Sequence, residues 1–322
     1  MFFRELFLEI KEVAIPLYKI LIPFVFIIKF FEVIGAIDFI SKIFAPLMGL
    51  IGLPPELGIV WVTAITINIY AALVLLINLI PGLDVTVAQI TILTTGILVC
   101  HNILIESAIS KSAGVSFIYT SLFRLFSAFI ICFILNSIYE AFNYLDYIYV
   151  PLFSIEPPQP GYVNWIIDEI KNLGIIFVII VILITILKIL KKIGVENFLK
   201  KILVTPLKFF GIGKEATNII IVGITIGLQY GGGILIKEVK SGKIDRSSAF
   251  LALSMLNLVH AVIEDTLLMM AFGGHYSGVL IARIFFGLIL CLVTLKIYQK
   301  YSNFYEKYIF DDTIRKLPKT KD

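Results

Sequence analysis

The sequence predicts an all-α membrane protein built from two inverted repeats, and three observations carry this prediction: composition, hydropathy and self-similarity. Of the 322 residues, 59% are hydrophobic and only 16% are charged, and the mean hydropathy is +0.98. Soluble domains carry about 25% charged residues, and much of their surface must face water. Since a fold of this size cannot hide so much apolar surface, the excess must face lipid. This composition excludes an ordinary soluble enzyme.

Charge and cysteine usage exclude two further classes. The net charge of +4 comes from Lys and Arg residues in short loops and in the tail at 301–322, so we interpret them as topology signals. No folded basic face for nucleic acid is expected. Cys100, Cys132 and Cys291 all lie inside apolar runs and form no CxxC pair, which argues against a disulfide framework or a redox site.

The apolar segments predict the helices. Eight segments approach the ~20 residues that a membrane-spanning helix needs. They cover residues 13–36, 55–80, 86–109, 116–138, 173–193, 214–238, 245–271 and 277–299. Two stretches, 38–50 and 196–210, alternate Lys with apolar residues at helical spacing, which predicts interfacial helices. Residues 1–13 mix charged and apolar side chains without the order of a cleaved signal, so we expect an amphipathic entry helix on the membrane surface.

A self-comparison predicts an internal duplication. An offset of 159 residues (260 − 101) aligns His101 with His260 and Arg124 with Arg283. The same offset pairs Gly35 with Gly194, Glu56 with Glu215, Gly114 with Gly273, and Cys132 with Cys291. We therefore expect a first repeat at 1–138, an external connector at 139–162, a second repeat at 163–300 and a cytoplasmic tail at 301–322.

Loop charges predict the orientation of the repeats, because cytoplasmic loops collect Lys and Arg. The connector 139–162 contains acidic residues but no Lys or Arg, which places it outside. Lys residues flank both ends of 214–238, so this segment and its counterpart 55–80 are expected to be re-entrant hairpins, the second turning near 229–233. Six crossings with cytoplasmic N- and C-termini follow, and an odd number per half makes the repeats inverted. Full spanning by the two hairpin segments stays open.

Two histidines mark the expected site. His101 and His260 fall near the middle of apolar segments, where an ionisable side chain normally faces a polar interior. Polar residues on the same segments extend this set: Asn102, Glu106, Asn257, Glu264 and Asp265. The hairpins add the amides of Asn68 and Gln229. We expect these side chains to form a substrate-binding site at the membrane midplane, where the repeats meet. The structural alternative is that they only join helices through hydrogen bonds.

Arg124 and Arg283 are expected to form structural ion pairs at the depth of Glu106 and Asp265, because an unpaired charge in lipid is costly. A metal site is a less favoured alternative: His260 and Glu264 have ligand spacing, but such pairs are common by chance and no HExxH motif is present. No GxSxG motif or Ser/His/Asp arrangement is recognisable. The sequence thus predicts no catalytic residue, no bound metal and no cofactor.

Three segments resemble a known family. They are His-Asn-Ile-Leu-Ile-Glu at 101–106, its repeat His-Ala-Val-Ile-Glu-Asp at 260–265, and the stretch 45–56. They are similar to the nucleoside recognition, or Gate, domain family, which includes spore maturation proteins A and B, concentrative nucleoside transporters and the membrane domain of ferrous iron transport protein B. The resemblance covers both halves and implies tandem Gate domains, each with an interfacial helix, a hairpin and two spans. It also implies a nucleoside-like or metal-ion substrate.

The sequence predicts a multi-pass transporter or permease of the cell membrane, with the lipid bilayer and a small polar solute as its partners. The resemblance makes that solute nucleoside-like. H⁺ or Na⁺ is the coupling ion we consider, since a His side chain titrates near neutral pH. A non-transporting scaffold and a divalent-metal transporter are the alternatives. The solute, the coupling ion, the transport direction and the oligomeric state, including a homo-oligomer, stay open.

Overall fold

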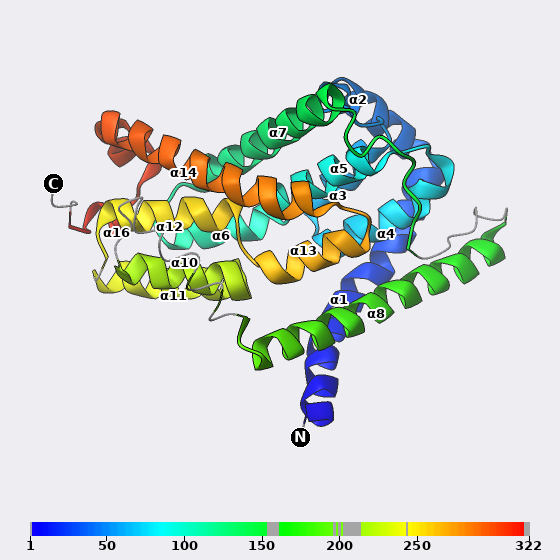
Figure 1. Ribbon diagram of the computed structural model, residues 1–322, viewed down its shortest axis with the longest axis horizontal. Coiled ribbons are helices and arrows are strands. Elements are labelled where there is room, and N and C mark those ends of the chain that lie inside the picture. The colour runs from blue at the N-terminus through cyan, green and yellow to red at the C-terminus, as the bar shows by residue number, and fades with distance from the viewer. Residues whose placement is uncertain are drawn as a thin grey trace.

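The computed structural model describes residues 2–152, 161–195, 214–242 and 244–318, together with residues 198 and 201. Helices dominate these residues, and β pairing among them is limited to two isolated bridges, Thr86–Ile148 and Val115–Phe310. The predicted all-α fold class is confirmed. Figure 1 shows an elongated layered bundle in which α1 and α8 cross beside the other helices.

The helices of the first half are α1 (Phe2–Val33), α2 (Ala36–Leu50), α3 (Leu57–Thr66), α4 (Ile69–Leu79), α5 (Val87–Cys100), α6 (Ile103–Ser112) and α7 (Phe117–Ala141). The second half contains α8 (Tyr162–Lys192), α10 (Lys214–Ile226), α11 (Leu228–Ser241), α12 (Arg246–Leu258), α13 (Val262–Ala271), the π-helical turn η2 (Ser277–Ala282) and α14 (Arg283–Lys300). The short turns α15 (Ser302–Phe304), η3 (Tyr305–Ile309) and α16 (Asp312–Arg315) follow.

Six helical segments of the described chain are long and apolar enough to cross a membrane. They are Phe2–Val33, Val87–Ser112, Phe117–Ala141, Tyr162–Lys192, Arg246–Ala271 and Ser277–Lys300. The most apolar windows of the second and fifth segments are 78% buried, whereas those of the first and fourth are only 28% and 22% buried. The pairs α5–α6 and α12–α13 therefore form the interior, and α1 and α8 present their apolar side chains outward, as lipid contact requires.

Each predicted hairpin segment is a pair of short helices, α3 with α4 and α10 with α11, and the members of each pair pack against each other (Figure 1). The predicted turn near 229–233 is wrong. The chain instead breaks at Gly227, which has a φ of 114°, and α11 continues through Gly231. A Cβ at Gly231 would lie 2.5 Å from the Cα of Gly223, so this glycine permits close helix packing and is not a turn residue.

Residues 2–13 are not a separate entry helix, because α1 is continuous from Phe2 to Val33. Lys188 of α8 holds this end of α1 through ion pairs with Glu9 at 2.8 Å and Glu5 at 3.5 Å. The interfacial helix expected at 38–50 corresponds to α2. Its expected counterpart at 196–210 lies outside the described residues, apart from residues 198 and 201.

Helix boundaries recur at the offset of 159 residues. The starts of α4, α5 and α6 at residues 69, 87 and 103 correspond to the starts of α11, α12 and α13 at residues 228, 246 and 262. Left-handed glycines recur as well, with Gly35 matching Gly194 and Gly114 matching Gly273. These correspondences support the predicted duplication, while the orientation of the halves across the membrane stays a prediction.

Candidate functional site: a buried cluster between two broken helices

The two central membrane segments are interrupted at equivalent places. Between α5 and α6, Asn102 has a φ of 52°, and between α12 and α13, Ala261 has a φ of 44°. Non-glycine residues rarely adopt this left-handed conformation, so tertiary contacts must hold it. The backbone N–H of Asn102 donates to the carbonyl of Ala64 at 2.8 Å, and that of Ala261 donates to the carbonyl of Gly223 at 3.1 Å. The hairpin of each half therefore fixes the break in its central helix.

Two fully buried arginines donate hydrogen bonds to backbone carbonyls at the ends of the interrupted helices. Arg124 on α7 donates from Nε to the Val99 carbonyl at 3.0 Å and from Nη2 to the His101 carbonyl at 2.9 Å. Arg283 on α14 makes the matching bonds to Leu258 at 3.2 Å and His260 at 2.9 Å. Since the carbonyls at a buried helix end need hydrogen-bond partners, both arginines have a structural role.

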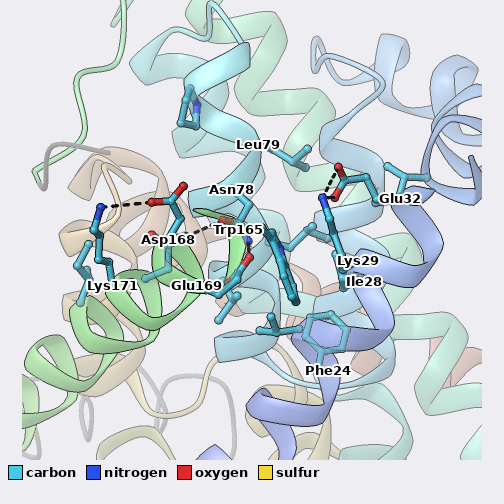
Figure 2. Close-up of a pocket in the computed structure, with 17 residues that line it drawn as sticks. Phe24, Ile28, Lys29, Glu32, Asn78, Leu79, Trp165, Asp168, Glu169 and Lys171 are labelled. Atoms are coloured by element: carbon cyan, nitrogen blue, oxygen red, sulfur yellow. Dashed lines mark hydrogen bonds and ion pairs between the residues drawn. The ribbon is translucent and has the colours of Figure 1, made fainter. Parts of the chain in front are cut away.

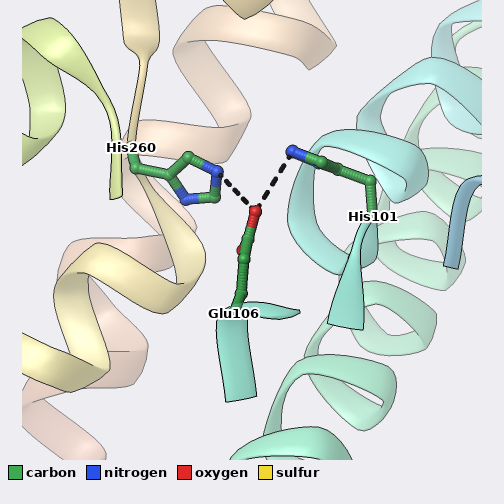
Figure 3. Close-up of side chains that lie close together, drawn as sticks. All are labelled: His101, Glu106 and His260. Carbon is green, nitrogen blue, oxygen red and sulfur yellow. Dashed lines mark ion pairs between the residues drawn. The ribbon is translucent and has the colours of Figure 1, made fainter. Parts of the chain in front are cut away.

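The breaks bring His101, Glu106 and His260 together (Figure 3). Nε2 of His101 and Nε2 of His260 each lie 3.4 Å from Oε1 of Glu106, which points between the two rings. The ring centroids are 5.2 Å apart. All three side chains are buried, with exposed fractions of 7%, 4% and 3%. The cluster therefore joins residues from both halves of the chain in the protein interior.

Each imidazole ring makes the same kind of hydrogen bond, to the backbone carbonyl four residues earlier in the chain. Nδ1 of His101 lies 3.1 Å from the Ile97 carbonyl, and Nδ1 of His260 lies 2.8 Å from the Leu256 carbonyl. Because a carbonyl oxygen can only accept, each Nδ1 must carry the proton. Each Nε2 is then directed at Glu106.

The two halves differ in their acids. Arg124 Nη1 donates to Oε2 of Glu106 in a buried ion pair, as expected from the sequence. The ion pair expected between Arg283 and Asp265 is absent among the described contacts, and Nη1 of Arg283 and Oδ2 of Asp265 lack hydrogen-bond partners. Asp265 occupies the position of Glu106 but is one methylene shorter. Its Oδ2 lies 4.0 Å from Nε2 of His260.

The other predicted site residues have different surroundings. Asn257 donates to Oγ of Ser110 at 2.9 Å, which joins the two halves, and its own Oδ1 lacks a partner. Asn68 caps α4 by accepting from the Ala71 N–H at 2.8 Å. Asn102 contributes the left-handed backbone of the first break. Glu264 is partly buried on α13 and is not a member of the cluster, and the side chain of Gln229 lies outside the described residues.

A second polar site was not predicted. It is a cavity of about 590 Å³ between α1, α4 and α8, shown in Figure 2. Asn78 donates to Oε1 of the buried Glu169 at 2.7 Å and accepts from Asn172 at 2.6 Å, while Oε2 of Glu169 lacks a partner. Glu169 and Asn172 are three residues apart within one apolar helix, and this spacing was the available sequence signal.

Comparisons with known proteins agree with this architecture. Residues 14–112 match the family model described as Gate, nucleoside recognition. The resemblance to the Gate family is confirmed for these residues of the first half, while the second Gate-like repeat stays a prediction. A curated relative is the uncharacterized membrane protein YvoD of Bacillus subtilis (strain 168), which is 24% identical over 288 residues, covering 88% of this chain and 90% of the relative. No solved structure matches. Together with the six apolar helices, these matches indicate a transporter-like membrane protein.

Proposed function

We propose that this protein is a permease for a small polar, nucleoside-like solute, which binds between the two halves at the His101–Glu106–His260 cluster. The observation that carries the proposal is the convergence of these three buried side chains at the breaks of two discontinuous central helices. Discontinuous helices at a repeat interface are how many transporters build a binding site. The Gate match supports the nucleoside-like class.

Unpartnered polar atoms near the cluster support a solute site. Oδ1 of Asn257, Oδ2 of Asp265 and Oγ1 of Thr266 are buried and without hydrogen-bond partners. All three belong to α12 and α13, on either side of His260. A buried polar atom without a partner costs about 1–3 kcal/mol, so such atoms usually meet a ligand or ordered water. A hydroxylated, amide-bearing solute supplies the complementary donors and acceptors.

Binding can be tested by a thermal-stability screen of the detergent-purified chain against nucleosides and nucleobases. A ligand present at ~100 times its dissociation constant should stabilise the protein by roughly 2.7 kcal/mol. Uptake of the labelled ligand into proteoliposomes, with and without gradients of H⁺ or Na⁺, then tests transport and coupling. The proposal expects both stabilisation and uptake to be lost in His101→Ala and His260→Ala.

The remaining histidine supplies the matched control. His275 lies in the turn between α13 and η2, outside the cluster, so His275→Ala should leave binding and uptake unchanged. Retained uptake in the two cluster variants would contradict the proposed site. Failure of the purified chain to carry any compound that stabilises it would contradict the proposed function.

A further inference from the structure

Three possible metal-ligand atoms lie close together in the cluster: Nε2 of His101, Nε2 of His260 and Oε1 of Glu106. Because the Nδ1 atom of each ring donates to a backbone carbonyl, Nε2 carries a lone pair whenever the ring binds no second proton. Both Nε2 atoms face Oε1 of Glu106. Buried acceptor atoms that face one another repel, and a cation or a proton between them offsets this repulsion. The arrangement therefore favours a positively charged partner at its centre.

The distances between the ligand atoms favour a metal ion over a hydrogen-bonded proton. Each Nε2–Oε1 separation is 3.4 Å, and the three ligand atoms all lie within 4.8 Å of one another. A direct N–H···O hydrogen bond typically spans about 2.7–3.2 Å, and one shared proton serves only one of the two contacts. Two ligand atoms bound at ~2.05 Å to a tetrahedral ion lie about 3.4 Å apart. The spacing fits metal ligands better than a hydrogen-bonded chain.

We propose that His101, Glu106 and His260 bind one divalent first-row transition-metal ion, such as Zn²⁺ or Co²⁺. Two imidazoles and one carboxylate suit these metals, whereas Mg²⁺ and Ca²⁺ prefer oxygen ligands throughout. The metal alternative considered from the sequence relied on His260 and Glu264, which share a helix. The three-dimensional cluster instead contains Glu106 of the first half.

The residues around the cluster support it as a metal site. Metal-binding histidines usually donate their second ring N–H to a carbonyl or carboxylate, as His101 and His260 do. Arg124 binds Oε2 of Glu106 and so directs Oε1 toward the rings. These contacts fix the ligand atoms before an ion arrives.

Three ligands from the described residues leave a fourth position of a tetrahedral ion open. That position can accept water or an electron-rich atom of a solute. This link between the ion and a solute rests on the proposed function. Metal binding itself does not, because it can be measured on the purified chain without a transport assay.

The test is titration of the full-length, chelator-treated protein with Co²⁺, followed by visible absorption, and with Zn²⁺, followed by equilibrium dialysis. The expected result is one metal ion per chain, with the intense d–d bands of a four-coordinate Co²⁺ site. An excess of Mg²⁺ or Ca²⁺ should not displace Co²⁺. Absence of stoichiometric metal in the folded wild-type chain would overturn the proposal without any variant.

Variants locate the ion. Since loss of an outer contact usually weakens metal binding by about 10–100-fold, loss of a ligand in His101→Asn, Glu106→Gln or His260→Asn should weaken it at least as much. His275→Ala and Glu264→Gln are matched controls and should keep wild-type affinity and spectrum. Unchanged binding in all three ligand variants, each shown to be folded by far-UV circular dichroism, would place the metal elsewhere and overturn the proposal.

The outcomes for metal and solute are separable. Solute uptake by a chain that binds no metal would overturn the metal site alone. Stoichiometric metal in a chain that carries no solute would overturn the permease and leave the metal site standing.

Discussion

The two halves of this protein share a backbone framework but use it differently. At equivalent positions, each half breaks its central helix, caps the break with an arginine and presents a histidine. Of the two equivalent arginine–acid pairs, only that of the first half forms an ion pair, because Glu106 reaches Arg124 whereas Asp265 lacks a contact with Arg283. The acids at these equivalent positions differ by one methylene, and this difference in length is the explanation we test below.

The hairpins show a second difference. Positions 64 and 72 carry alanine in the first half, and the equivalent positions 223 and 231 carry glycine. In the second hairpin, α10 and α11 approach so closely that a methyl group at Gly231 would collide with the backbone of Gly223. The second hairpin therefore has no room at position 231 for the alanine that stands at the equivalent position 72.

The largest effect should come from removing the paired arginine. Arg124→Met leaves the Glu106 carboxylate buried and unpaired, and breaking a buried ion pair typically costs about 3–5 kcal/mol. Arg283→Met removes hydrogen bonds to carbonyls but no ion pair, so we expect a smaller loss of about 1–3 kcal/mol. Denaturant unfolding in mixed micelles, followed by far-UV circular dichroism, measures both. Equal losses of unfolding free energy in the two variants would contradict the idea that only Arg124 forms an ion pair that stabilises the fold.

The glycine contact in the second hairpin should give the next largest effect. In Gly231→Ala the new methyl group would collide with the backbone of Gly223, and overpacking of this kind typically costs about 1–3 kcal/mol. A Cβ added at Gly233 on the same helix would have no neighbouring atom within 4 Å. Gly233→Ala is therefore the matched control, and it should raise helix stability by up to about 1 kcal/mol. A tolerated Gly231→Ala would show that the close approach is not required.

Asp265→Glu should make the second half resemble the first. The longer side chain is expected to reach Nη1 of Arg283, and a new buried hydrogen bond contributes about 1 kcal/mol. An increase in the unfolding midpoint would sharpen the explanation based on side-chain length. Asp265→Asn has no added length and should give no such increase. If Asn also stabilised the protein, the cause would be removal of the negative charge of Asp265 and not a longer side chain.

The smallest effect concerns pH. His275 stands at the position equivalent to Ser116, which caps α7 and does not titrate. Partial burial lowers the pKa of His275 below its usual value near 6.5. As the pH falls, His275 therefore takes up a proton in the unfolded chain before it does so in the folded chain. The free energy of unfolding is then unaffected by His275 above about pH 6.5 and falls below it. His275→Gln should reduce the fall in melting temperature between about pH 8 and pH 5.5, and an unchanged profile would assign that fall to other groups.

Periodicity and composition predicted much of the helical framework but missed its interruptions. Hydropathy marked the long apolar segments, since a run of ~20 apolar residues is itself the signal. The breaks at Asn102 and Ala261 carry neither glycine nor proline. Hydrogen bonds from distant hairpins hold them, and a local pattern cannot contain that information. The turn at Gly227 was misplaced because several nearby glycines carry the same signal.

The candidate site was partly predictable for a similar reason. Intramembrane histidines and acids stand out from apolar sequence because burying them is costly, so the sequence alone singles out His101, Glu106 and His260. No local pattern favours Glu106 over Glu264 as the acid shared by both rings. Asn68 and Asn102 stand out in the same way, although their observed contacts cap a helix and form a helix break.

The sequence by itself determined the membrane class, most of the apolar helices and the small set of ionisable residues worth testing, because these follow from the cost of placing polar groups in lipid. Only the tertiary structure decided where the central helices break, which acid meets both histidines, and that Glu169 borders a separate cavity. Those features depend on contacts between residues far apart in the chain, which no local sequence pattern contains.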